Sequence, residues 1–155
     1  MIISFILDNI VSNLINYDSL FYPLFTLLSL ILIYPNYNKK NNKYFIVSFI
    51  LGLIYDLVLN TLFLNAFIFL LLSYILRLIF TKIKYNYLSV LFISILSIVY
   101  YRIITYIVLL ILNYLEFNVF TLFKSIYSSI ILNIIYVSIF YLLKRLIFNK
   151  KKHIY

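Results

Sequence analysis

The sequence predicts an all-α membrane protein: a polytopic bundle of six transmembrane helices that forms a single domain over residues 1–155. The first observation is composition, because 66% of the residues are apolar, 11% are charged and the mean hydropathy is +1.09. A soluble domain keeps about a quarter of its residues charged. The second observation is that long apolar runs follow one another with only short polar segments between them. The third is that basic residues gather in alternate connections, which is typical of membrane topology.

Proline, asparagine and acidic residues delimit the apolar runs. Pro35 ends the second run, and a tight uncharged connection from Asn60 to Asn65 separates the third run from the fourth. A polar segment that contains Glu116 separates the fifth run from the sixth. The predicted spans are residues 2–16, 20–34, 44–60, 66–80, 87–112 and 119–143, and residues 144–155 form a basic cytoplasmic tail.

The first run leaves the number of spans open. A helix over residues 2–16 rises about 22 Å, whereas the hydrocarbon core is about 30 Å thick. The run also contains Asp8, Asn9 and Asn13. Either it crosses as a tilted span through a thinned bilayer, which gives six spans, or it inserts partly, which gives five spans and an N-terminus outside.

The distribution of Lys and Arg predicts the topology, because cytoplasmic loops are enriched in both. Six spans place the basic connections and both termini on the cytoplasmic side of a multi-pass cell membrane protein. The same side chains are expected to contact anionic membrane lipid, and their position at the ends of apolar runs argues against nucleic acid despite the net charge of +9. They are Lys39, Lys40, Lys43, Lys82, Lys84, Lys144, Arg145, Lys150, Lys151 and Lys152.

The sharpest motif is Gly52-Leu53-x-x-Asp56 in the third run, which holds the only glycine of the chain. An ionised carboxylate in hydrocarbon costs at least a few kcal/mol, so Asp56 is expected to face protein or water. Gly52 lies one turn earlier on the same face and lets another helix approach closely. Two interpretations stay open: a packing glycine beside a satisfied structural carboxylate, or a conformational or partner-facing polar site.

No enzyme, metal or cofactor site is predicted. Cysteine is absent, and the single histidine, His153, lies in the basic tail. A lone carboxylate without an acid–base partner or a nucleophile is poor evidence for catalysis.

Arg102 is the natural intramembrane partner of Asp56. At about 1.5 Å per residue, Asp56 lies about 18 Å and Arg102 about 22 Å from the predicted cytoplasmic ends of their spans. Opposite charges at nearly the same depth, each costly alone, are expected to form an ion pair. The alternative is that a polar cavity accommodates Asp56 while carbonyl or hydroxyl groups such as that of Thr105 bind Arg102.

Small and polar residues also mark one face of the sixth run. Ser125, Ser129 and Asn133 recur every four residues, which is typical of a helix-packing stripe. Asn133 has a second interpretation, in which its amide bonds to the end of a neighbouring helix.

The order of these features resembles the bacterial rod-shape-determining MreD family over essentially the whole chain. The resemblance is carried by the block Phe49–Asp56, the short connection with Leu64-Asn65-Ala66, and a last helix with Ile131-Leu132-Asn133 and a basic end at Lys144-Arg145. The family usually has glycine in the turn after the motif helix, where this chain has Asn65. Because asparagine tolerates the left-handed conformation, the turn is expected to survive.

The resemblance implies a non-enzymatic scaffold of the bacterial elongation (rod) complex, which supports cell shape and lateral peptidoglycan synthesis. It implies an MreC-like bitopic partner and, through that partner, MreB and the RodA/penicillin-binding-protein synthase. The family fold also resembles the substrate-binding subunits of energy-coupling-factor transporters, so a small-molecule-binding transporter subunit is the alternative. Such subunits usually dock through an alanine motif, and this chain has one alanine, Ala66.

Overall fold

The computed structural model describes residues 1–14, 23–37, 42–59, 61 and 63–152 of the chain. Within these residues every regular element is helical, which confirms the all-α prediction. The elements are α1 (Ile2–Leu14), α2 (Phe25–Ile33), the 3₁₀ turn η1 (Tyr34–Asn36), α3 (Lys43–Leu59), α4 (Leu64–Lys82), α5 (Tyr87–Ile111) and α6 (Val119–Lys152).

Within the part of the chain that the structure describes, three helices are long and apolar enough to cross a membrane: α4, α5 and the part of α6 from Val119 to Leu146. α1 and the segment formed by α2 and η1 are apolar but shorter. The chain is therefore a helical membrane protein, and the count of six spans stays a prediction.

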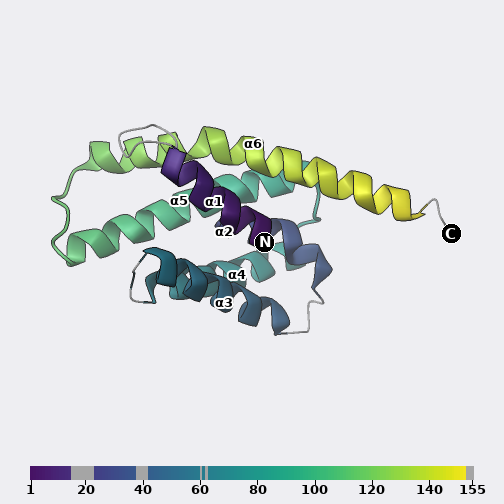
Figure 1. The fold of residues 1–155 in the computed structure, drawn as a ribbon, viewed down its shortest axis with the longest axis horizontal. Helices are drawn as coiled ribbons and strands as arrows, with labels where there is room; N and C mark the ends of the chain where they lie inside the picture. The colour runs from purple at the N-terminus through teal and green to yellow at the C-terminus, as the bar shows by residue number, and fades with distance from the viewer. Residues whose placement is uncertain (15–22, 38–41, 60, 62, 153–155) are drawn as a thin grey trace.

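The helices pack as antiparallel neighbours around α2. α3 packs on α4 and α5 packs on α6, whereas α2 contacts α1, α4, α5 and α6. Figure 1 shows the α5–α6 pair extending past the ends of α3 and α4. The tip of this pair, residues 111–120, is exposed at every position.

α2 forms the centre of the core. Every side chain from Phe25 to Leu32 is buried, on all faces of the helix. A helix that is apolar all round is stable only when it is surrounded by other elements, because it offers no polar face to water. The four helices that contact α2 supply that environment.

Two helices have bounds that differ from those of the predicted spans. The second helix begins at Phe25 rather than at residue 20, and the residues at positions 15–22 lie outside the described part of the chain. The last helix does not end at residue 143 but continues to Lys152. Lys and Arg are good helix formers, and neither proline nor glycine interrupts the sequence there, so the basic segment predicted as a tail continues the helix as far as Lys152.

An aromatic cluster joins several elements at one end of the bundle. It consists of Tyr34 at the end of α2, Tyr44 on α3, Phe80 on α4, Tyr85 in the α4–α5 connection and Tyr141 on α6. Its ring centroids are 4.8 Å apart for Tyr34 and Phe80, and 6.0 Å apart for Tyr85 and Tyr141.

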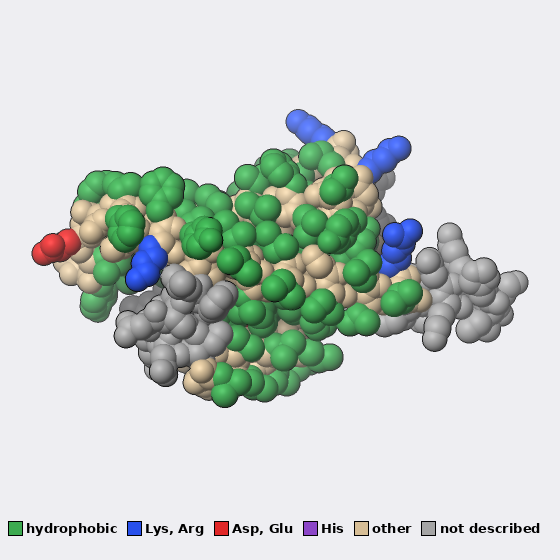
Figure 2. Space-filling model, turned by 90° about the horizontal axis from the view of Figure 1, so that it is seen from above, with side chains coloured by type: hydrophobic (Ala, Val, Ile, Leu, Met, Phe, Trp, Pro, Cys, Tyr) green, Lys and Arg blue, Asp and Glu red, His purple; other side chains and the backbone are tan. Residues whose placement is uncertain are grey.

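Basic residues of four helices lie at the end of the bundle where the aromatic cluster is found. Lys43 begins α3, Lys82 ends α4 and Lys84 precedes α5. On α6, Lys144 lies three positions after Tyr141, which belongs to the aromatic cluster. Figure 2 shows several Lys and Arg side chains gathered at one end, an acidic side chain with one basic side chain beside it at the opposite end, and apolar side chains over the surface between them. Lys39 and Lys40 lie outside the described residues. That the basic end faces the cytoplasm stays a prediction.

The topology is testable because the chain has no cysteine. Lys84→Cys lies at the basic end and Asn118→Cys lies at the tip between α5 and α6, and both positions are exposed. We expect a membrane-impermeant maleimide to label Asn118→Cys in intact cells and to label Lys84→Cys only after the membrane is opened. Labelling of Lys84→Cys in intact cells would contradict the predicted orientation.

Candidate functional site: two carboxylates that cap buried helices

The motif glycine lets α3 and α4 approach to backbone contact. A methyl group added at Gly52 would overlap Ala66 Cα and would lie 2.7 Å from the Asn65 carbonyl oxygen. Both atoms belong to the backbone of the first turn of α4, so they have no side-chain freedom with which to move away. Ala66 is itself fully buried. Glycine on α3 and alanine on α4 are therefore the two small residues of one close helix crossing.

The motif carboxylate caps α4. Asp56 Oδ1 accepts hydrogen bonds from Asn65 N (2.9 Å), Asn65 Nδ2 (3.0 Å) and Thr61 Oγ1 (2.5 Å). Its Oδ2 accepts one from Ala66 N (2.8 Å). The first N–H groups of a helix have no partner within the helix, and together they carry a partial positive charge. Asp56, which is buried, supplies the acceptors and the compensating negative charge from the end of the preceding helix.

Asn65 extends this network to α5. The Tyr101 hydroxyl donates to Asn65 Oδ1 over 2.8 Å, and Asn65 Nδ2 also donates to Thr61 Oγ1 over 3.0 Å. Tyr101 and Asn65 are both buried. A single polar network, made of Asp56, Thr61, Asn65 and Tyr101, therefore connects α3, the connection after it, α4 and α5.

The expectation that Asn65 forms the turn is wrong. Asn65 lies inside α4, and Phe63 takes the left-handed conformation instead, with φ of 55° and ψ of 8°. This conformation at the residue before α4 reverses the chain so that Asn65 N and Ala66 N point back at Asp56. A left-handed residue other than glycine costs about 1–3 kcal/mol, which the hydrogen bonds to the carboxylate offset.

Arg102 joins α5 to α6. Its Nε donates to Ser129 Oγ over 2.8 Å, and Ser129 Oγ in turn donates to the Ser125 carbonyl over 2.8 Å. Of the small-polar stripe, Ser129 thus lies at the α5–α6 contact. Asn133 instead accepts a hydrogen bond from Leu24 N at the start of α2, in agreement with its second interpretation. The direct ion pair between Arg102 and Asp56 stays a prediction, because the contacts described above account for the Asp56 oxygens without it.

A second carboxylate, Asp8, caps the start of α2 in the same way that Asp56 caps the start of α4. Asp8 Oδ1 accepts from Phe25 N over 2.7 Å and Oδ2 accepts from Thr26 N over 2.8 Å. Leu24 N, one residue earlier, donates to Asn133 Oδ1 on α6 over 2.7 Å. Three consecutive backbone donors at the start of a buried helix are therefore satisfied by side chains of two other helices.

Sequence reasoning did not find the role of Asp8. The available signal was its spacing, because Ser4 and Asp8 are four residues apart on one helix, as are Gly52 and Asp56. Ser4 is buried and its hydroxyl lies 2.6 Å from the Tyr136 hydroxyl of α6. The buried face of α1 thus resembles that of α3 in carrying a small residue one turn before an aspartate.

The fold and these networks define a class of protein: a helical membrane protein whose buried carboxylates cap helix ends within the bundle. Among the described residues, no group of three or more His, Cys, Asp or Glu side chains is placed to hold a metal ion. The family model described as rod shape-determining protein MreD matches residues 1–150. The chain belongs to the MreD family, which confirms the resemblance and makes it a rod-shape-determining membrane protein rather than a member of a known enzyme family. No curated protein and no solved structure matches the chain.

Gly52→Ala tests the close helix crossing. The added methyl group must push the backbone of α4 away, which is expected to cost about 1–3 kcal/mol and to lower the melting temperature of the purified protein in detergent. Ile50→Ala is the matched control, because Ile50 is on the same helix and its side chain is 49% exposed. An unchanged melting temperature for Gly52→Ala would contradict the contact with Ala66.

A double-mutant cycle tests the pairing of Asp56 with Arg102. If the two charges form a buried pair, removal of either partner costs about 3–5 kcal/mol, because the other charge is left uncompensated. We therefore expect Asp56→Ala/Arg102→Ala to be more stable in detergent than the sum of the two single losses predicts. Strictly additive losses would remove the ion pair and leave Asp56 as a helix cap alone.

Proposed function

We propose that this protein is a non-enzymatic scaffold of the bacterial elongation complex, which holds an MreC-like bitopic protein in the plasma membrane. Through that partner it would act on MreB filaments and on the RodA/penicillin-binding-protein synthase, and so support lateral peptidoglycan synthesis. The observation that carries the proposal is the family match, which extends over residues 1–150.

The roles of the buried polar groups support a scaffold. Asp8 and Asp56 are the two acids of the described bundle core, and each binds backbone N–H groups at the start of a helix. Carboxylates used in this way stabilise the helix arrangement and are not directed at a reactant. A bundle held by such contacts presents a fixed outer surface to a partner.

The tip of the α5–α6 pair is the surface that we assign to the partner. Tyr114, Phe117 and Phe120 are each 75% exposed, and they lie where this pair extends past α3 and α4 (Figure 1). Exposed aromatic side chains contribute large apolar contact areas and are enriched where proteins associate. The tip lies at the end of the bundle opposite the basic flanks, which is the outer end in the predicted topology.

The transporter-subunit alternative gains no support from the structure. Ala66, the only alanine of the chain, is fully buried against Gly52, so it offers no small-residue surface for docking to another subunit.

Affinity capture from native membranes tests the proposed role. We expect the tagged protein to recover an MreC-like protein, and Phe117→Ala/Phe120→Ala at the tip to reduce that recovery several-fold. Phe67→Ala/Phe92→Ala is the matched control, because these side chains are also exposed, at 59% and 62%, but lie on the sides of α4 and α5. Recovery of a transporter ATPase module without an MreC-like protein would overturn the proposal, and equal loss in both variants would remove the tip from it.

A further inference from the structure

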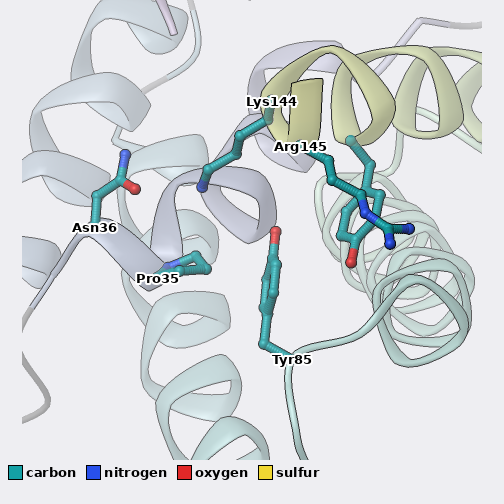
Figure 3. Close-up of a pocket in the computed structure, with 6 residues that line it drawn as sticks. Pro35, Asn36, Tyr85, Lys144 and Arg145 are labelled. Atoms are coloured by element: carbon teal, nitrogen blue, oxygen red, sulfur yellow. The ribbon is translucent and has the colours of Figure 1, made fainter. Parts of the chain in front are cut away.

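Two adjoining cavities lie at the basic end of the bundle, where α2 ends. The first has a volume of about 270 Å³ and the second a volume of about 230 Å³. Asn36 and Lys144 line both, so the cavities meet at these two side chains. Figure 3 shows Lys144 reaching from α6 toward the turn at Pro35 and Asn36, with the ring of Tyr85 beside it.

The first cavity is cationic. Its lining consists of Pro35, Asn36, Tyr85, Tyr141, Lys144 and Arg145, so it combines two cations with hydroxyl and amide groups and contains no acidic side chain. The acids of the described residues are engaged elsewhere or lie at the far end, because Asp8 and Asp56 cap helices and Glu116 lies between α5 and α6. An occupant of complementary charge is an anion.

The position of Lys144 is fixed by the end of α2. Lys144 Nζ donates to the Leu32 carbonyl and lies 5.8 Å from the centroid of the Tyr85 ring. The Tyr85 hydroxyl donates to the same carbonyl over 3.4 Å, and burial raises the pKa of this phenol, which keeps it a neutral donor. A cation at a helix C-terminus is stabilised by the helix dipole, so the ammonium group is held at the junction of the two cavities rather than extended into water.

The second cavity is mainly apolar, and Ser4, Ser29 and Tyr136 contribute hydroxyl groups to its lining. Ile3, Leu32, Ile33 and Phe140 line it between α1, α2 and α6. Ile3 is 64% exposed on the surface of α1, where the bilayer would surround the protein. The second cavity therefore provides a mainly apolar space beside Lys144, bounded on one side by the exposed helix α1.

We propose that the two cavities together bind one anionic phospholipid. Lys144 and Arg145 bind the phosphate of the headgroup, and one acyl chain lies in the apolar cavity between α1 and α6. A free phosphate would fill only the cationic cavity, and a zwitterionic lipid would bring no net negative charge to the two cations. Basic pockets between transmembrane helices are a known form of headgroup site. This lipid site is independent of the proposed binding of a partner at the opposite end.

Native mass spectrometry of the full chain tests the proposal. The protein, released from detergent in the presence of equimolar phosphatidylglycerol and phosphatidylcholine, is expected to retain one phosphatidylglycerol in preference. Arg145→Gln should lower that preference about fivefold, the effect of one basic residue near an anionic lipid surface. Arg145 is the suitable position because its side chain is exposed, whereas Lys144 also stabilises the end of α2.

Lys84→Gln is the matched control. Lys84 is exposed at the same end of the bundle but does not line either cavity, so its removal should leave the preference unchanged. Equal retention of both lipids, or equal losses in the Arg145 and Lys84 variants, would show only general attraction to a basic surface and would overturn the site.

Two further experiments distinguish a bound lipid from a bound free anion. Ile33→Trp places a larger side chain in the apolar cavity, which leaves less space for an acyl chain while both cations stay intact, so it should reduce phosphatidylglycerol retention. Millimolar inorganic phosphate should not displace the lipid from the unchanged protein. Displacement by inorganic phosphate together with unchanged retention in Ile33→Trp would contradict the proposal, because it would identify a site for the anion alone.

Discussion

The structure depends on satisfying the first backbone N–H groups of two helices that begin inside the bundle. No water is present in a hydrocarbon core to accept these hydrogen bonds, and each unsatisfied group costs several kcal/mol. Asp8 and Asp56 meet this requirement for α2 and α4. The same contacts remove the problem of the buried carboxylates, because a helix N-terminus carries the partial positive charge that each needs. The cost of the unsatisfied N–H groups and the cost of the buried carboxylates are therefore removed by the same hydrogen bonds. These bonds also fix the position of α1 against α2 and of α3 against α4.

Of these two capping contacts, the sequence indicated only the one made by Asp56, because its motif contains residues that are rare in this chain. Gly52 is the only glycine, and Asp56 lies deep in a long apolar run, so both stood out and their shared face was correctly inferred. Asp8 has the same chemistry but lies in a short run beside two asparagines, where it counted as evidence against a membrane crossing. Its role becomes visible only when the second helix is known to begin at Phe25, since that start places the donors.

Contacts that depend on helix rotation were not accessible from the sequence. Tyr101 is one of 17 tyrosines, and nothing in its neighbours distinguishes the one that reaches Asn65. Depth alone suggested Asp56 as a partner of Arg102, and it gave no indication of Ser129 on α6, to which Arg102 donates. The left-handed residue was expected at Asn65 from residue preference, but the direction in which α4 must start assigns it to Phe63. Tertiary geometry thus overrode local propensity where the helices turn.

The burial of α2 on all sides has a consequence for the order in which the protein is made. α2 is among the first segments to leave the ribosome, but Leu24 N is bonded to Asn133, 109 residues later in the chain. At about 5–20 residues per second, this partner is synthesised roughly 5–20 s after Leu24. Throughout that interval, α2 lacks its contact with α6, and Leu24 N lacks the Asn133 oxygen as its hydrogen-bond acceptor. The centre of the bundle can therefore be completed only after the last helix has been made.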